Sequence, residues 1–362
     1  MTRRTAISLA LRLVCLLLAG ALLWLTARRT DADLLEALRT ALRRPLALAI
    51  LLYGFAQVLG AWRWKTLLDV QGLGLTLWDA LRLTLVGNFF SLIIPGAVTG
   101  DILKIAFATQ KHPGKASELA LVDLVDRVIG LFGIFFAAAI AWILFFRQGG
   151  HDSMANAADD LRSLNRILRA GSIAISLGFV GFFALLFVWN TQPYWMRWHW
   201  VQALLNAMQN LLPKKITAIV KRMDDALGLY RGHRKALFGA LLISVVIHLT
   251  VSGTVFFLGK ALHESRMNFS EYALTTQLAN VTGLVPVTPG GLGVRDAVAA
   301  ELFVCFQATP ESVRGTIPLL NSLIIVFWGL AGALIYVCSP SFKQPIRTTD
   351  AAPEPSLSDN HN

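Results

Sequence analysis

Two apolar segments of this chain are broken at Pro-Gly pairs, and polar or charged residues stand on both sides of each break. A membrane helix that runs through Pro-Gly frees backbone groups that lipid cannot hydrogen-bond. Matching breaks in two half-chains therefore indicate a transporter binding site near the middle of the bilayer. The candidate headgroup residues at the breaks are Asn88, Gly96, Gly100, Asp101 and Lys104 in the first segment, and Asn280, Gly290, Gly291, Gly293, Arg295, Asp296 and Glu301 in the second.

The chemistry that these residues offer is the binding of an anion. Each half-helix that leaves a break presents free N–H groups and a positive dipole end, which favour a lipid phosphate. The glycines permit positive φ angles and close backbone approach. Arg295 is the only Lys or Arg in the second segment, 272–306, and its guanidinium group can bind a phosphate through two parallel hydrogen bonds. Asn88 and Asn280 could bind the same headgroup, but we favour hydrogen bonds to carbonyls that the breaks set free.

Each break combines both signs of charge. Asp101 and Asp296 stand near half-helix starts, where capping is the simpler role, and a carboxylate there repels a phosphate unless a cation lies beside it. Lys104 follows Asp101 at a spacing of i,i+3, and Arg295 adjoins Asp296. This mixture suits a zwitterionic or amine-bearing lipid head, and it suits a self-neutralised structural pair equally well.

Further ionisable groups lie inside apolar runs. Asp123 and Arg127 are spaced i,i+4 and can pair on one helix face, with Asp126 beside them. Buried charges in spans indicate function, and snorkelling to the interface is the competing interpretation. Glu301 could be a proton or amine site. His248 forms a polar stripe with the serines four residues to either side, which is typical of hydrogen bonding between helices.

The composition predicts a membrane protein. The chain has 362 residues, of which 55% are hydrophobic and only 15% charged, with a mean hydropathy of +0.57. A soluble domain carries about 25% charged residues. We therefore expect an all-α polytopic membrane protein with about six full transmembrane helices and two re-entrant half-helix hairpins. The expected spans are 6–26, 45–62, 119–146, 170–189, 236–259 and 316–337, and the broken segments are 78–107 and 272–306.

The order of spans and breaks predicts one transmembrane domain, 1–340, built as inverted halves of about 1–148 and 165–340. An amphipathic cytoplasmic segment is expected at 195–235, and a disordered tail at 341–362. With the N- and C-termini in the cytoplasm, the cytoplasmic loops hold sixteen Lys and Arg against eleven outside. Eight of the sixteen lie in 190–235. The net charge of +11 therefore reflects topology and anionic lipid and does not indicate a nucleic-acid partner.

Three runs carry a family resemblance: 87–101 with Pro95-Gly96 and Gly100-Asp101, 122–130 with Asp126-Arg127, and 286–296 with Pro289-Gly290-Gly291 and Arg295-Asp296. They resemble the membrane region of lysylphosphatidylglycerol synthases and the related free-standing, flippase-like membrane proteins. The resemblance covers roughly 6–337. It implies a protein of the bacterial inner membrane that handles a lipid, in some members an aminoacylated phospholipid moved between leaflets. The synthases carry a catalytic domain after this region and the present sequence does not, so we expect no aminoacyl transfer.

Three functions stay open at this stage. The first is a lipid flippase or transporter whose ligand carries an anionic phosphate. The second is a membrane-embedded enzyme that modifies a lipid, although no nucleophile motif or metal-ligand spacing supports it, and we expect no cofactor and no metal. The third is an accessory scaffold for a lipid or glycan synthase, and homo-oligomerisation is a further alternative. The cysteines, Cys15, Cys305 and Cys338, all lie in apolar runs and imply no disulfide framework.

Overall fold

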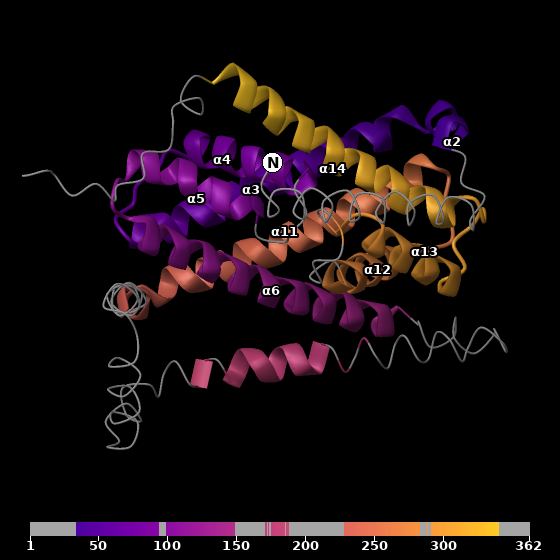
Figure 1. Cartoon of the computed structure of the whole chain (residues 1–362). Helices are drawn as coiled ribbons and strands as arrows, with labels where there is room; N and C mark the ends of the chain where they lie inside the picture. Colours follow the sequence, from indigo (N-terminus) through magenta and orange to yellow (C-terminus); the bar gives the residue numbers. More distant parts are fainter. Residues whose placement is uncertain are drawn as a thin grey trace, which may run out of the picture.

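In a computed structural model of the protein, the described residues are 34–93, 99–148, 171–187 except 172, 174 and 185, then 228–282, 288 and 291–339. Every regular element in this part of the chain is helical (Figure 1). The labelled helices are α2 (Leu34–Thr40), α3 (Arg43–Val70), α4 (Leu77–Ile93), α5 (Thr99–Lys111), α6 (Ala116–Arg147), α11 (Arg234–Ala261), α12 (Phe269–Thr282), α13 (Val294–Cys305) and α14 (Val313–Cys338).

Four helices within the described residues are long and apolar enough to cross a membrane: α3, α6, α11 and α14. They coincide with four of the six expected spans and extend them by one to three residues at each end, except that α3 continues eight residues beyond 62. The expected span 6–26 lies outside the described residues. Of 170–189, the structure describes an apolar helical stretch at Ile175–Ala184. The segment 195–227 and the tail 341–362 also lie outside, so their predicted states stay predictions.

Each broken segment forms two short helices with the break between them. In the first segment α4 ends at Ile93 and α5 begins at Thr99, and in the second α12 ends at Thr282 and α13 begins at Val294. With 12 to 17 residues each, these helices are shorter than the roughly 20 residues that a span requires. The outer ends of α4 and α5 are joined by Lys111, which lies 2.7 Å from Asp79 and lowers the pKa of that carboxyl.

The two helix pairs lie at opposite ends of the bundle (Figure 1). At the end of α4 and α5, the Tyr230 hydroxyl donates to the Leu67 carbonyl at 3.1 Å. At the end of α12 and α13, the Leu42 N–H donates to the Ala261 carbonyl at 2.9 Å. Helices of the two halves also pack against each other. The short helix α4 packs against α14, α12 packs against α6, and α3 and α11 run along each other.

Two glycines explain how the broken segments fold locally. Gly100, at the start of α5, approaches α4 so closely that an added Cβ would overlap the Gly87 carbonyl oxygen and the Ser91 hydroxyl. Gly293 has φ +85°, a left-handed conformation that side chains with a Cβ adopt only with strain. It directly precedes α13 and so allows the chain to turn into that helix. Close approach and positive φ, both expected at the breaks, are thus confirmed at these positions.

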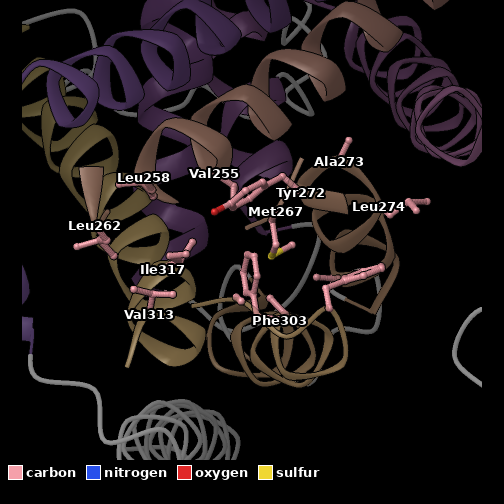
Figure 2. Close-up of a cluster of buried hydrophobic side chains, with 14 of the residues drawn as sticks. Val255, Leu258, Leu262, Met267, Tyr272, Ala273, Leu274, Phe303, Val313 and Ile317 are labelled. Atoms are coloured by element: carbon pink, nitrogen blue, oxygen red, sulfur yellow. The ribbon is translucent and has the colours of Figure 1, made fainter. Parts of the chain in front are cut away.

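An apolar core joins the second broken segment to the long helices (Figure 2). Tyr272 and Phe303 are fully buried, with ring centroids 5.6 Å apart, and they tie α12 to α13. Val255 of α11 and Ile317 of α14 belong to the same cluster. Burial of such side chains on all sides fixes where α13 begins, and therefore where Arg295 lies.

Candidate functional site

One cavity brings together helices that flank the two breaks, α4 of the first broken segment and α13 of the second. Five polar side chains from α3, α4 and α13 line it: Tyr53, Gln57, Asn88, Ser91 and Arg295. Asn88 belongs to the first broken segment and Arg295 to the second. The sequence therefore identified two residues from opposite halves of the chain that share this site.

The cavity has a volume of about 270 Å³. Its remaining described lining is apolar and comes from Leu92 of α4 and from Ile325, Trp328 and Gly329 of α14. Its residues on α3 and α14 lie near the middle of those long helices, which run Arg43–Val70 and Val313–Cys338. The site thus lies midway between the two ends of the bundle.

Arg295 is the only charged side chain among the described residues that line this cavity. Its side chain is 14% exposed, and its Nη2 donates to the Ser322 hydroxyl at 3.1 Å and lies 3.5 Å from the Asp296 carboxylate. Because both contacts use the same nitrogen, the other N–H groups of the guanidinium can face another partner. An arginine held in this way on a rigid helix is suited to bind an anion in the cavity.

Asp296 has the capping role that the sequence favoured. One carboxylate oxygen accepts the Gly293 N–H at 2.9 Å and the Ser322 hydroxyl at 2.7 Å, and the side chain is 1% exposed. Asp296 thus caps the first turn of α13 and also pairs with the side chain of its neighbour Arg295. Asp296 and Arg295 line a second, smaller cavity of about 20 Å³ together with Asn280, which has room for roughly one water molecule.

Asn88 and Asn280 each line a cavity together with Arg295, Asn88 the larger one and Asn280 the smaller one. The Asn88 amide donates to the Gln57 side chain of α3 at 2.8 Å. The sequence favoured hydrogen bonds to the freed carbonyls, and the described contact of Asn88 is different because Gln57 faces it across the helix interface. Gln57 and Tyr53 were not predicted as site residues, although a lone amide inside an apolar run is the signal that could have found Gln57.

The other predicted charges form a separate cluster between α3, α5 and α6. Lys104 Nζ lies 2.5 Å from Asp123 and 3.7 Å from Asp101, and 4.5 Å above the Trp64 ring. Arg127 donates to Asp101, and its Nε lies 4.0 Å from Asp123. The predicted pairs of Lys104 with Asp101 and of Asp123 with Arg127 are thus confirmed.

Asp126 completes this ion-pair cluster through Arg63, which directly follows the expected span 45–62 and lies inside α3 in the structure. Arg63 of α3 donates to both oxygens of Asp126, at 2.8 and 2.9 Å, and its side chain is only 12% exposed. The cluster therefore pairs three cations with three carboxylates: Arg63, Lys104 and Arg127 with Asp101, Asp123 and Asp126. None of the six lines either cavity. The predicted headgroup residues are thus divided between a cavity and a neutral ion-pair cluster.

The polar stripe of α11 hydrogen-bonds to neighbouring helices, as predicted. Ser244 accepts from Arg63 at 2.9 Å, and Ser252 accepts from Gln277 of α12 at 2.8 Å. The His248 ring nitrogen Nε2 lies 3.1 Å from the Gly130 carbonyl of α6. These bonds join α11 to three helices.

Glu301 has an exposed side chain and lines neither cavity, so its role as a proton or amine site stays a prediction. It lies on the face of α13 opposite the buried Ala299 and Phe303. Gly96 and Gly290 lie outside the described residues. Gly291 has φ +72° and belongs to the turn before α13.

This chain belongs to the family of the lysylphosphatidylglycerol synthase TM region, whose family model matches residues 9–332. The match spans both halves of the chain and includes every residue of the cavity and of the ion-pair cluster. The predicted membership is thereby confirmed. No curated protein matches the chain.

Proposed function

We propose that this protein is a lipid transporter that moves a polar lipid between the leaflets of the bacterial inner membrane, with the central cavity as its headgroup site. The observation that carries this proposal is the cavity of about 270 Å³ at mid-length of α3 and α14, into which Arg295 extends. Transporters place their substrate site near the bilayer midplane, where broken helices of two repeats meet. Membership of the lipid-synthase membrane family supports a lipid as the cargo.

In this proposal, α4–α5 and α12–α13 are re-entrant hairpins of an inverted repeat. Their location at opposite ends of the bundle and the exchange of partners, α4 with α14 and α12 with α6, support it. Both α5 and α13 then begin near the midplane, so that their positive ends face the headgroup. This arrangement requires that the breaks be buried in protein or line a water-filled cavity, because lipid cannot satisfy irregular backbone.

The test is lipid movement in reconstituted vesicles. Purified protein would be placed in proteoliposomes whose lipids carry a headgroup label, and the fraction of label that reaches the other leaflet would be measured over time. We expect movement above that of protein-free vesicles, and loss of it in Arg295→Ala. A scaffold or an enzyme predicts no movement, and a scaffold also predicts that Arg295 can be replaced without consequence.

A further inference from the structure

We infer that the central cavity selects a lipid whose head is an anionic phosphodiester with hydroxyl groups and no amine, and that it rejects aminoacylated phospholipids. The inference rests on the proposed function for the assumption that the ligand is a lipid. It specifies the class of headgroup and differs from the sequence-based expectation, in which the mixed charges suited a zwitterionic or amine-bearing head.

The first argument is charge. Among the described lining residues one side chain is charged, and it is the cation Arg295. The sequences of the break segments 94–98 and 283–290 contain no Asp, Glu, Lys or Arg. Among the described residues that line this cavity, an ammonium group moved in from water would meet a cation and no carboxylate, which is unfavourable in a partly dry environment.

The nearest carboxylate is already engaged. Asp296 is 1% exposed and accepts from the Gly293 N–H and the Ser322 hydroxyl while it pairs with Arg295. An amine would have to break this cap to reach it. The three carboxylates of the ion-pair cluster lie outside the cavity lining, and each pairs with a cation of the protein.

The second argument is hydrogen bonding and size. Tyr53, Gln57, Asn88 and Ser91 each offer both a donor and an acceptor, which is the complement of a hydroxyl group. The cavity volume of about 270 Å³ is at the small end of ligand pockets, which measure about 300–1,000 Å³. A lysyl group esterified to a phosphoglycerol head roughly doubles its number of non-hydrogen atoms, so the cavity favours the head without it.

The experiment compares lipids for binding, without transport. The full chain in detergent micelles would be mixed with equal amounts of phosphatidylglycerol, phosphatidylethanolamine and lysylphosphatidylglycerol, and bound lipid counted by native mass spectrometry. We expect phosphatidylglycerol to be favoured by about tenfold or more over both amine-bearing lipids. The variant Gln57→Glu, nearly unchanged in size, adds a carboxylate beside Asn88 and should reverse the order. Gln110→Glu, on α5 and away from the cavity, is the matched control and should keep it.

Equal or tighter binding of lysylphosphatidylglycerol to the unaltered protein overturns the inference, as does a Gln57→Glu variant with unchanged selectivity. Soluble glycerol 3-phosphate is added in a separate arm. If it displaces phosphatidylglycerol at comparable concentration, the site binds a free phosphate ester and the assignment to a lipid is overturned. Selective binding without any movement of lipid in vesicles would uphold the inference and refute the transport function.

Discussion

Asn88 and Arg295 come from the two broken segments, in opposite halves of the chain, and line one cavity. The cavity lies where α4 of the first half and α13 of the second half both pack against α14. Arg295 is held by Ser322 and Asp296 of its own half and lines the cavity with residues of both halves, whereas the ion-pair cluster lies among α3, α5 and α6 and hydrogen-bonds to Ser244 of the second half. This separation makes different predictions for the two groups of charges.

Replacing Arg295 should reduce transport more than it reduces folding. Lys keeps the charge and loses the two-donor fork, so Arg295→Lys should retain partial transport, and Arg295→Ala should abolish it. The measurement is lipid movement per folded molecule, with the folded amount taken from the monodisperse peak in size-exclusion chromatography. Full activity per folded molecule in Arg295→Ala, with reduced yield, would assign the residue to structure through its contact with Asp296.

Breaking the buried pair of Arg63 and Asp126 should destabilise the protein. Asp126→Asn leaves a buried guanidinium without its counter-ion, which costs about 3–5 kcal/mol. Asp69→Asn is the matched control, because Asp69 pairs with Lys65 but is 45% exposed, and surface pairs contribute about 0–1 kcal/mol. Thermal unfolding in detergent should show a large decrease in Tm for the first variant and little change for the second.

The double variant Arg63→Met with Asp126→Leu separates structure from function in the cluster. Removing both charges removes the desolvation cost together with the attraction, so we expect the Tm to recover most of the loss. If the pair is structural, lipid movement recovers with it. A stable double variant without movement would give Arg63 or Asp126 a direct part in transport.

The close approach of α5 to α4 should be sensitive to a single methyl group. Gly100→Ala places a Cβ against the Gly87 carbonyl and the Ser91 hydroxyl, and the helix pair must separate, at a cost of about 1–3 kcal/mol. Gly60→Ala in α3 is the control, since nothing lies within 4 Å of its Cβ, and there the better helix former should be neutral or stabilising. Equal thermal stability of the two variants would contradict this packing.

The topology predicts that the end of the bundle near Arg231 faces the cytoplasm. Cys15, Cys305 and Cys338 would first be replaced by Ser, and Arg231→Cys then introduced as the only thiol. A membrane-impermeant maleimide should fail to label this position in intact cells and should label it after permeabilisation. Labelling in intact cells would reverse the assignment of both ends, because the Tyr230 hydroxyl holds this segment to the Leu67 carbonyl at one end of α3.

The sequence alone determined the fold class, four of the described long helices and the two breaks. These features are local, because an apolar run of sufficient length spans a bilayer and Pro-Gly ends a helix whatever surrounds it. The pairs of Lys104 with Asp101 and of Asp123 with Arg127 were predictable for the same reason, since helical spacing brings their side chains together. Positive φ at Gly293 was expected because glycine, which has no Cβ, adopts that conformation readily.

Only the tertiary structure decided which charges share a site. Arg63 lies just beyond the expected span 45–62, and its burial against Asp126 depends on the packing of α3 beside α6. Glu301 lies in an apolar run of the sequence, but the orientation of α13 exposes its side chain. Tyr53 and Gln57 became site residues because α4 brings Asn88 to the middle of α3. Such contacts join residues far apart in the chain, and their selection depends on how all helices fill the interior together.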